Sequence, residues 1–378
     1  MTLFDSHCHV DFAEFDADRA DVLQRAREAG VSEMVVPGYE PEQWLRAGAV
    51  ALAATERGLR VHMAVGVHPY ALADVASEWL VASPGALAAT LAEAATMQGV
   101  VAIGECGLDA PLADRVGNAC SLAGQSAVLR EHLHAAHECG LPLVMHVVKA
   151  HGLALELLRT APAPRSPMRG VIHAFSGSPE LVREYVDLGF MLGFGGALTR
   201  PTHEKARAAA LATPDEWLLV ETDAPSGRLE SGPARNEPAA LARVVETLAQ
   251  LRGQAVEHVA AVTSANARKV VKGPCVTLLG YEETLTPMLL STGTPKHDGD
   301  PLRTCFLRTM GNRVSDVVGI ETADFVKVSA RVSYSVTFLA EHEETPYADG
   351  VLGDWVRTLA ALRFEPRHTP FVLRLLEK

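Results

Sequence analysis

Two histidines near the start of the chain have the spacing of a metal chelate. His7 and His9 flank Cys8 directly after a short apolar run. Residues two apart on a β-strand point to the same side, so both imidazoles are expected to face the same way. A lone His-x-His pair is equally compatible with two polar residues in a turn. Its meaning therefore depends on whether further ligands converge on it.

Imidazoles and carboxylates also follow other apolar runs of the sequence. Divalent cations that are hard or borderline bind such groups when they converge from separate strands. Glu105 stands among Ile103, Gly104, Cys106 and Gly107, where a structural carboxylate has no evident partner. We therefore predict a divalent-metal site formed by His7, His9, Glu105, His146, His173 and Asp223.

The elements that must position these residues follow from the alternation of apolar runs with longer Ala/Leu/Glu/Arg-rich stretches. Short β-branched runs that alternate with amphipathic helices, such as Asp18–Ala29 and Cys120–Cys139, indicate repeated βα units. Eight such units most economically close into a TIM-type (β/α)8 barrel, and a doubly wound open sheet is the second choice. The expected strands are Leu3–His7, Ser32–Pro37, Val61–Val67, Val100–Glu105, Leu143–Val147, Gly170–Ala174, Met191–Phe194 and Trp217–Glu221.

Motifs across residues 1–272 together resemble the TatD family of metal-dependent nucleases, within the amidohydrolase-like barrels. They occur in the order of the family and span nearly all of this region. The segments that carry the resemblance are DSHCHVDF (5–12), AVGVHPY (64–70), AIGECGLD (102–109), GLPLVMH (140–146), VIHAFSGSPE (171–180), GFMLGFGG (189–196), LLVETDAP (218–225) and RNEP (235–238).

The resemblance implies a pair of divalent metal ions, which Zn, Mg, Mn or Fe would equally fit. It implies that His7, His9 and Asp223 hold one ion, that His146 and His173 hold the other, and that Glu105 bridges both. Two such ions lower the pKa of a bound water and neutralise phosphoryl oxygens. Asp223 and Glu105 are then the expected catalytic residues, with Asp223 as general base toward the water.

Other side chains near these motifs are candidates for contacts with the substrate. His68 is expected to meet a substrate phosphate or to hold a turn, and Arg235 to position substrate or to anchor the last loop. Family members usually carry Arg and Asp just after the fifth-strand His, whereas here Lys149 is the basic residue. Asp109 is expected to orient a ligand from behind. The segment 110–115 (APLADR) lacks the aromatic residues usual in the family, which weakens the case for base stacking.

The pattern of the sequence changes after Val271. Gly280–Arg308 and Asp316–Phe338 resemble the shoulder region of the major vault protein, related to the SPFH or stomatin-like fold. The alternating run Phe325–Phe338 predicts a long strand with one solvated face. We therefore expect a small α+β domain over 273–378, in assembly or partner binding, as a homo-oligomer or with a vault-like partner, or packed on the barrel as a stabilising domain.

Bulk composition limits the class of protein. A net charge of −12 argues against a long basic groove for nucleic acid, so a bound phosphate is expected to be met chiefly by metal ions. Six cysteines without a CxxC pair indicate reduced thiols. The sequence has neither a signal-peptide pattern nor a long apolar run, so we expect a cytoplasmic protein that does not enter a membrane.

Three hypotheses follow, in order of preference. The first is a two-metal phosphodiesterase or deoxyribonuclease, such as a 3'-5' exonuclease. The second is a small-molecule hydrolase of a phosphate ester, amide or lactone, which the acidic charge and the altered loops favour. The third is a structural or recognition component of a vault-like assembly, against which the full set of ligands argues.

Overall fold

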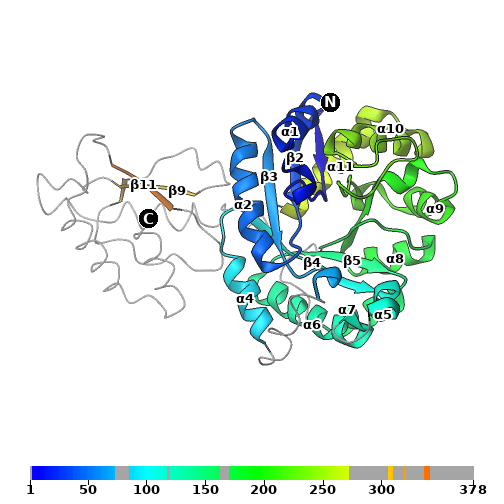
Figure 1. Cartoon of the computed structure of the whole chain (residues 1–378), viewed down its shortest axis with the longest axis horizontal. Helices are drawn as coiled ribbons and strands as arrows, with labels where there is room; N and C mark the ends of the chain where they lie inside the picture. Colours follow the sequence, from blue (N-terminus) through cyan, green and yellow to red (C-terminus); the bar gives the residue numbers. More distant parts are fainter. Residues whose placement is uncertain are drawn as a thin grey trace, which may run out of the picture. The chain divides into compact units, whose positions relative to one another are not determined.

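A computed structural model describes residues 2–72, 85–116, 120–161, 170–271, 305–309, 319–320 and 336–340. The chain divides into two compact units, Met1–Cys275 and Val276–Lys378. In the first unit, helices surround a central set of strands (Figure 1).

Eight parallel strands form one sheet in which each strand pairs with the next along the chain. Ser6 N donates to Val220 O (3.1 Å) and Asp223 N donates to His7 O (2.9 Å), which brings the two ends of the sheet together. The result is a near-closed barrel, as expected, and not a doubly wound open sheet. The strands are β1 (Leu3–Asp5), β2 (Val31–Val36), β3 (Arg60–Val65), β4 (Val100–Asp109), β5 (Leu143–Val148), β6 (Gly170–Ile172), β7 (Phe190–Phe194) and β8 (Leu218–Val220).

The helices lie around this sheet and begin and end at residues with suitable backbone preferences. Pro41 and Pro179 stand in the first turns of α2 and α8, where a missing N–H costs no hydrogen bond. Gly140 and Gly253 adopt left-handed conformations that end α6 and α10. The helices are α1 (Arg19–Glu28), α2 (Pro41–Thr55), α4 (Ala86–Ala94), α5 (Ala110–Val116), α6 (Leu122–Cys139), α7 (His151–Thr160), α8 (Pro179–Asp187), α9 (Glu204–Ala212), α10 (Leu241–Arg252) and α11 (Val256–Val271).

Buried apolar side chains from all eight strands, together with Ala267 and Val270 of α11, pack in the interior of the barrel. A second, larger apolar core occupies the space between strands and helices. Apolar packing on both faces is what a parallel sheet requires, and it leaves the carboxyl ends of the strands for polar groups. The inward-facing residues are Phe4, Val35, Ala64, Ala102, Val144, Val171, Met191 and Leu219.

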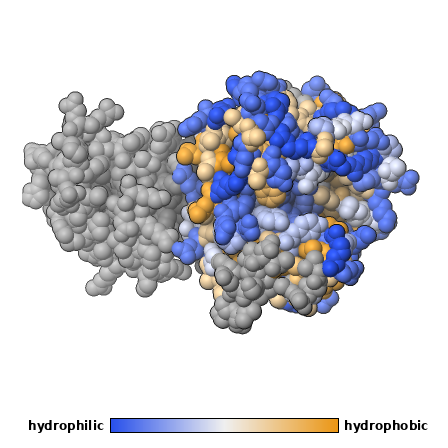
Figure 2. All heavy atoms as spheres, viewed as in Figure 1, coloured by the Kyte–Doolittle hydropathy of each residue, from blue (hydrophilic) through white to orange (hydrophobic). Residues whose placement is uncertain are grey.

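The surface of the barrel is mostly hydrophilic in the face that Figure 2 shows, with apolar residues over parts of it. Helix α2 contributes Leu45 and Leu52, which are 73% and 70% exposed. Among the described residues, no helix combines the length and the apolar character needed to cross a bilayer.

Two features of the barrel differ from the expected elements. Strand β4 continues past Glu105 to Asp109, and its pairing with β5 shifts register between Gly104 and Cys106. The segment after Asp109 forms the helix α5. A bulge bends a strand and redirects its side chains, so β4 can carry Glu105 along its length and Asp109 at its end.

In the second unit, three short strands form an antiparallel sheet in the order β10–β9–β11. They are β9 (Cys305–Thr309), β10 (Gly319–Ile320) and β11 (Val336–Ala340). Most of the expected strand over 325–338, and most of the segments that resemble the vault shoulder, lie outside the described residues.

Candidate metal centre

The predicted ligands lie at or near the carboxyl ends of the strands. Three non-glycine residues in the loops that follow these ends have positive φ angles. Within the described ranges, the non-glycine residues with positive φ are Lys149, Ala174 and Asp223, which lie one, two and three residues after the end of a strand, respectively. Such conformations cost free energy and gather at functional sites. The loops after β5, β6 and β8 are therefore held in shapes that the sequence alone does not favour.

Glu105 is the centre of the cluster, because its two carboxylate oxygens face two different groups of imidazoles. Oε2 lies 3.1 Å from His7 Nε2 and 3.5 Å from His9 Nε2. Oε1 lies 2.9 Å from His173 Nε2 and 3.1 Å from His146 Nδ1. The side chain is buried, so these groups are its immediate environment.

The first group joins the β1 and β8 ends of the barrel. His7 Nε2 and His9 Nε2 lie 3.3 Å apart, and each is 3.8 Å from Asp223 Oδ1. Asp5 fixes both segments, since its carboxylate accepts hydrogen bonds from Thr222 N (3.0 Å) and Thr222 Oγ1 (2.6 Å). One buried acid thus sets the distance between the loop of His7 and the loop of Asp223.

The second group joins the ends of β3, β5 and β6. His146 Nδ1 and His173 Nε2 lie 3.3 Å apart. His68 Nε2 lies 3.2 Å from Glu105 Oε1, so this residue, expected at the substrate, lies within reach of the same carboxylate oxygen. His68 Nδ1 accepts a hydrogen bond from Tyr70 N (3.0 Å), which leaves Nε2 to face the cluster.

Two further carboxylates hold imidazoles of the second group from behind. Asp109 Oδ2 lies 3.1 Å from His146 Nε2, on the ring edge away from Glu105, a position from which a carboxylate can orient this imidazole. Glu221 Oε1 lies 3.4 Å from His173 Nδ1 and accepts a hydrogen bond from Ala174 N (2.5 Å). Pairs of this kind fix the orientation of a ligating imidazole and raise its basicity.

Glu221 was not among the residues predicted for the site. The expected eighth strand ended at this residue, whereas β8 ends at Val220. Gly193 on β7 leaves the space for the carboxylate, because a Cβ at that position would lie 2.2 Å from Glu221 Oε2. Glu221 and Asp223 repeat the two-residue spacing of His7 and His9, and that spacing was the available signal.

The buried side chains of the cluster have shifted pKa values. Burial opposes ionisation of Glu105, but His173, His68 and His7 outweigh it and hold the pKa of the carboxyl well below its usual range. Burial also opposes protonation of His173, yet Glu105 and Glu221 raise its pKa well above the usual value. For His68 burial dominates and lowers the pKa to about 4, so this imidazole is neutral at neutral pH.

The other predicted substrate-binding residues lie in different surroundings. Lys149 is exposed one residue beyond β5. Arg235 forms a two-pronged ion pair with Asp18 (2.7 Å to each oxygen) and donates to Glu237 (3.0 Å) and to Glu14 O (2.8 Å). These contacts are those of a residue that anchors the last loop to the segment before α1.

Aromatic side chains surround His68 although segment 110–115 lacks them. Tyr39 stacks on His68 with ring centroids 5.3 Å apart, and Phe12 packs on Tyr39 at the same distance. Tyr70 is 44% exposed, lies 5.9 Å from the His146 ring and donates to Asp109 Oδ2 (3.2 Å). Rings therefore come to this side of the metal centre from the segments after β1, β2 and β3.

Known proteins of one family match this chain over the whole barrel. Residues 4–272 match the family model described as TatD related DNase. The metal-dependent hydrolase YjjV of Escherichia coli is 35% identical over 260 residues, which are 68% of this chain and 92% of that protein. A 3'-5' ssDNA/RNA exonuclease TatD of Cronobacter sakazakii is 34% identical over 276 residues, 71% of this chain and 97% of that protein.

A solved structure agrees with these sequence matches. The crystal structure of E. coli YjjV superposes with a TM-score of 0.62 at 32% identity and covers 72% of this chain and 98% of that one. The barrel with its centre of imidazoles and carboxylates, together with these matches, shows that the chain belongs to the TatD related DNase family of metal-dependent hydrolases.

Proposed function

We propose that the barrel hydrolyses phosphodiester bonds of single-stranded nucleic acid from the 3' end, with two divalent cations bridged by Glu105. The observation that carries the proposal is the placement of the two Glu105 oxygens, one toward His7 and His9 and the other toward His146 and His173. A carboxylate that serves one cation needs only one such group of imidazoles.

The spacing of the histidine nitrogens and of the Glu105 oxygens suits the binding of metal ions. Ligand atoms on a tetrahedral zinc, at roughly 2.0–2.1 Å from the metal, lie about 3.4 Å apart. The His7–His9 and His146–His173 nitrogen pairs are each separated by 3.3 Å. Glu105 Oε2 is buried without a hydrogen-bond partner, and a cation would satisfy it.

The chemistry of the proposal divides between the cations and the chain. When bound, divalent cations activate water as a nucleophile and neutralise phosphoryl oxygens. Asp223 lies at the exposed side of the first group and would accept the proton of the attacking water. His68, neutral beside Glu105, would donate a hydrogen bond to the phosphate or complete the second group of ligands.

Two lines support a single-stranded nucleic acid as the substrate. The printed name of the Cronobacter relative assigns it single-stranded DNA and RNA. In this chain the exposed Tyr70 lies beside His146, and aromatic rings hold unpaired bases by stacking.

A hydrolysis screen with purified full-length protein tests the function. The substrates are 5'-labelled single-stranded and double-stranded DNA, RNA, and a lactone, each with Mg²⁺, Mn²⁺ or Zn²⁺. We expect stepwise shortening of single strands from the 3' end, lost after EDTA treatment and in the Glu105→Gln variant. Activity on the lactone alone would contradict the proposal in favour of a small-molecule hydrolase.

For the second unit, residues 276–378, which we call the tail, we propose a role in assembly or partner binding. The proposal rests on the resemblance of its segments to the vault shoulder. The TatD relatives align over 92% and 97% of their own length with the barrel region, so the tail is an addition to an otherwise whole hydrolase. Gel filtration of the full chain and of residues 1–275 tests this role. The same oligomeric state for both, with no partner retained by the full chain, would contradict it.

A further inference from the structure

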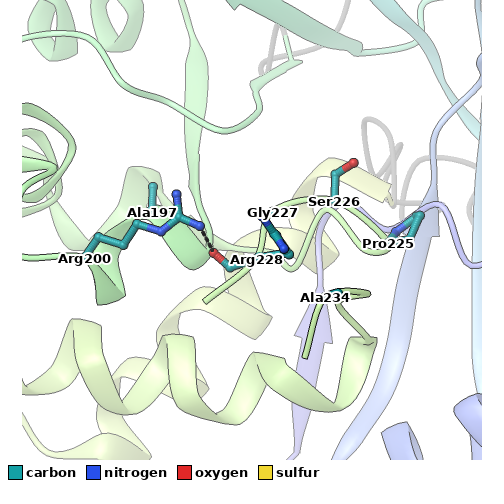
Figure 3. Close-up of a pocket in the computed structure, with 7 residues that line it drawn as sticks. All are labelled: Ala197, Arg200, Pro225, Ser226, Gly227, Arg228 and Ala234. Atoms are coloured by element: carbon teal, nitrogen blue, oxygen red, sulfur yellow. Dashed lines mark hydrogen bonds between the residues drawn. The ribbon is translucent and has the colours of Figure 1, made fainter. Parts of the chain in front are cut away.

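A pocket whose lining includes two arginines lies in the loops that follow β7 and β8, and Asp223 stands in the second of these loops. It has a volume of about 490 Å³, a size that accommodates a small-molecule moiety. Its walls come from the turn after β7 and from the loop after β8 (Figure 3). The lining residues are Ala197, Arg200, Pro225, Ser226, Gly227, Arg228 and Ala234.

The electrostatic character of the pocket is opposite to that of the protein. The chain carries a net charge of −12, yet this lining includes two arginines and no acid. In the part of the chain that the structure describes, neither Arg200 nor Arg228 forms an ion pair, whereas Arg235 is tied to Asp18 and Glu237. Arginines that line one cavity and form no ion pair are suited to bind an anion.

The pocket is built on a fixed backbone. Arg200 donates to Arg228 O (2.9 Å), which joins its two walls (Figure 3). Asn236 is buried and holds the loop from below, with Nδ2 donating to Thr222 O (2.9 Å) and to Gly227 O (3.2 Å). The backbone around the pocket is therefore preorganised.

The pocket lies close to the proposed catalytic base. Pro225 and Ser226 line it and follow Asp223 by two and three residues. Gly227 also lines it, and a Cβ added to Gly227 would lie 3.0 Å from the Cβ of Asp223. A strand whose scissile phosphate is held at Asp223 would therefore bring a neighbouring phosphate near the pocket.

We propose that this pocket is an anion subsite that binds a phosphodiester of the substrate strand other than the scissile one. The inference rests on the proposed function and deepens it, because it selects oligonucleotides over esters with a single phosphate. It also supplies the basic contact that the family usually places after the fifth strand, where this chain has the exposed Lys149.

The test compares two substrates of the full-length protein. The p-nitrophenyl ester of thymidine 5'-monophosphate contains only the scissile phosphate, whereas a thymidine trinucleotide brings a second one. We expect Arg200→Gln and Arg228→Gln each to raise KM for the trinucleotide about tenfold with kcat unchanged, as for loss of one charged hydrogen bond. KM for the single-phosphate ester should not change.

Salt dependence separates an anion contact from a structural effect. Each lost phosphate contact should flatten the plot of log KM against log salt concentration by about 0.7, the value for single strands. Arg228→Lys should keep the slope because it keeps the charge. The matched control is Arg183→Gln on α8, whose side chain is 87% exposed, and it should leave both KM and slope unchanged.

The outcomes distinguish this inference from the function on which it rests. Hydrolysis of both substrates with the same KM and slope in all variants would overturn the subsite and leave the function intact. Hydrolysis of neither substrate would refute the function, and fluorescence anisotropy with labelled oligothymidylate then decides the subsite. Equal affinity of wild type, Arg200→Gln and Arg228→Gln would overturn it, and weaker binding by both variants would support it.

Discussion

Replacing Glu221 with Gln tests whether a carboxylate behind His173 holds that imidazole as a metal ligand. The substitution keeps the shape of a buried side chain and removes its charge. Glu221 Oε1 accepts from Ala174 N at 2.5 Å and lies 3.4 Å from His173 Nδ1. A glutamine oxygen can replace Oε1, but as a neutral acceptor.

The expected magnitude follows from these contacts. A hydrogen bond to a charged acceptor contributes about 1.5–3 kcal/mol and a neutral one about 1 kcal/mol, so the orientation of His173 loses roughly 1–2 kcal/mol. Since about 1.4 kcal/mol is a factor of ten, the affinity of the second group for its cation should fall by about 10–100-fold. Gly193→Ala should act in the same direction, because its Cβ would lie 2.2 Å from Glu221 Oε2.

Calorimetric titration of EDTA-treated protein with Zn²⁺ or Mn²⁺ measures this loss. The matched control is Glu216→Gln, an exposed acid five residues earlier, which should titrate like the wild type. Unchanged affinity in Glu221→Gln would refute the role of Glu221 in orienting His173. Loss of one whole equivalent of metal would instead make Glu221 a direct ligand, which its distance of 3.4 Å from His173 Nδ1 also permits.

Four further predictions concern the same barrel. Elemental analysis of Glu105→Gln should show metal lost from both groups, whereas Asp223→Asn should keep the cation at His146 and His173; equal loss in both would contradict the bridge. Adding Zn²⁺ at 100 times its Kd to EDTA-treated protein should stabilise it by about 2.7 kcal/mol in thermal unfolding, and an unchanged Tm would argue against binding to the folded state. Arg235→Gln should lower Tm and leave KM unchanged, since Arg235 pairs with Asp18 and Glu237; a raised KM at unchanged Tm would return it to substrate binding. Burial lowers the pKa of His132 from 6.5 to about 4 in the folded chain. The unfolded chain therefore binds this proton at a higher pH, and stability that is present above pH 6.5 is lost as pH falls toward 4. Between pH 7 and pH 5, the free energy of unfolding measured in urea should fall by about 2 kcal/mol more for the wild type than for His132→Gln, and an equal fall in both would refute this.

The barrel was predictable because its signals are local in the sequence. Each strand is a short apolar run, and all eight expected strands overlap the observed ones. His132 lies on α6, where its Nε2 accepts a hydrogen bond from Val67 N (2.9 Å) in the segment after β3 and its Nδ1 bonds to Val128 O (2.8 Å).

What could not be predicted depends on register and on partners distant in sequence. The expected fourth strand ended at Glu105, whereas the shifted pairing of β4 carries the strand on to Asp109, next to His146. The aromatic rings near His68 come from residues 12, 39 and 70, which no single window brings together. The arginine pocket likewise joins Arg200 to a loop 28 residues away.

Metal ligands are easier to predict from a sequence than the residues that orient them, and Glu221 illustrates the reason. A ligand must lie at the rim of the barrel, so the sequence can be searched for polar residues near the ends of apolar runs, and Glu221, directly after Leu218–Val220, is itself such a residue. A residue behind a ligand is defined only by the side chain that it touches, and His173 is 48 positions earlier in the chain. Its recognition needs the neighbouring strand as well, because Glu221 fits only where Gly193 on β7 has no side chain. A glycine on one strand and an acid just after the next therefore form a single feature, and substitution of either should disturb the same imidazole.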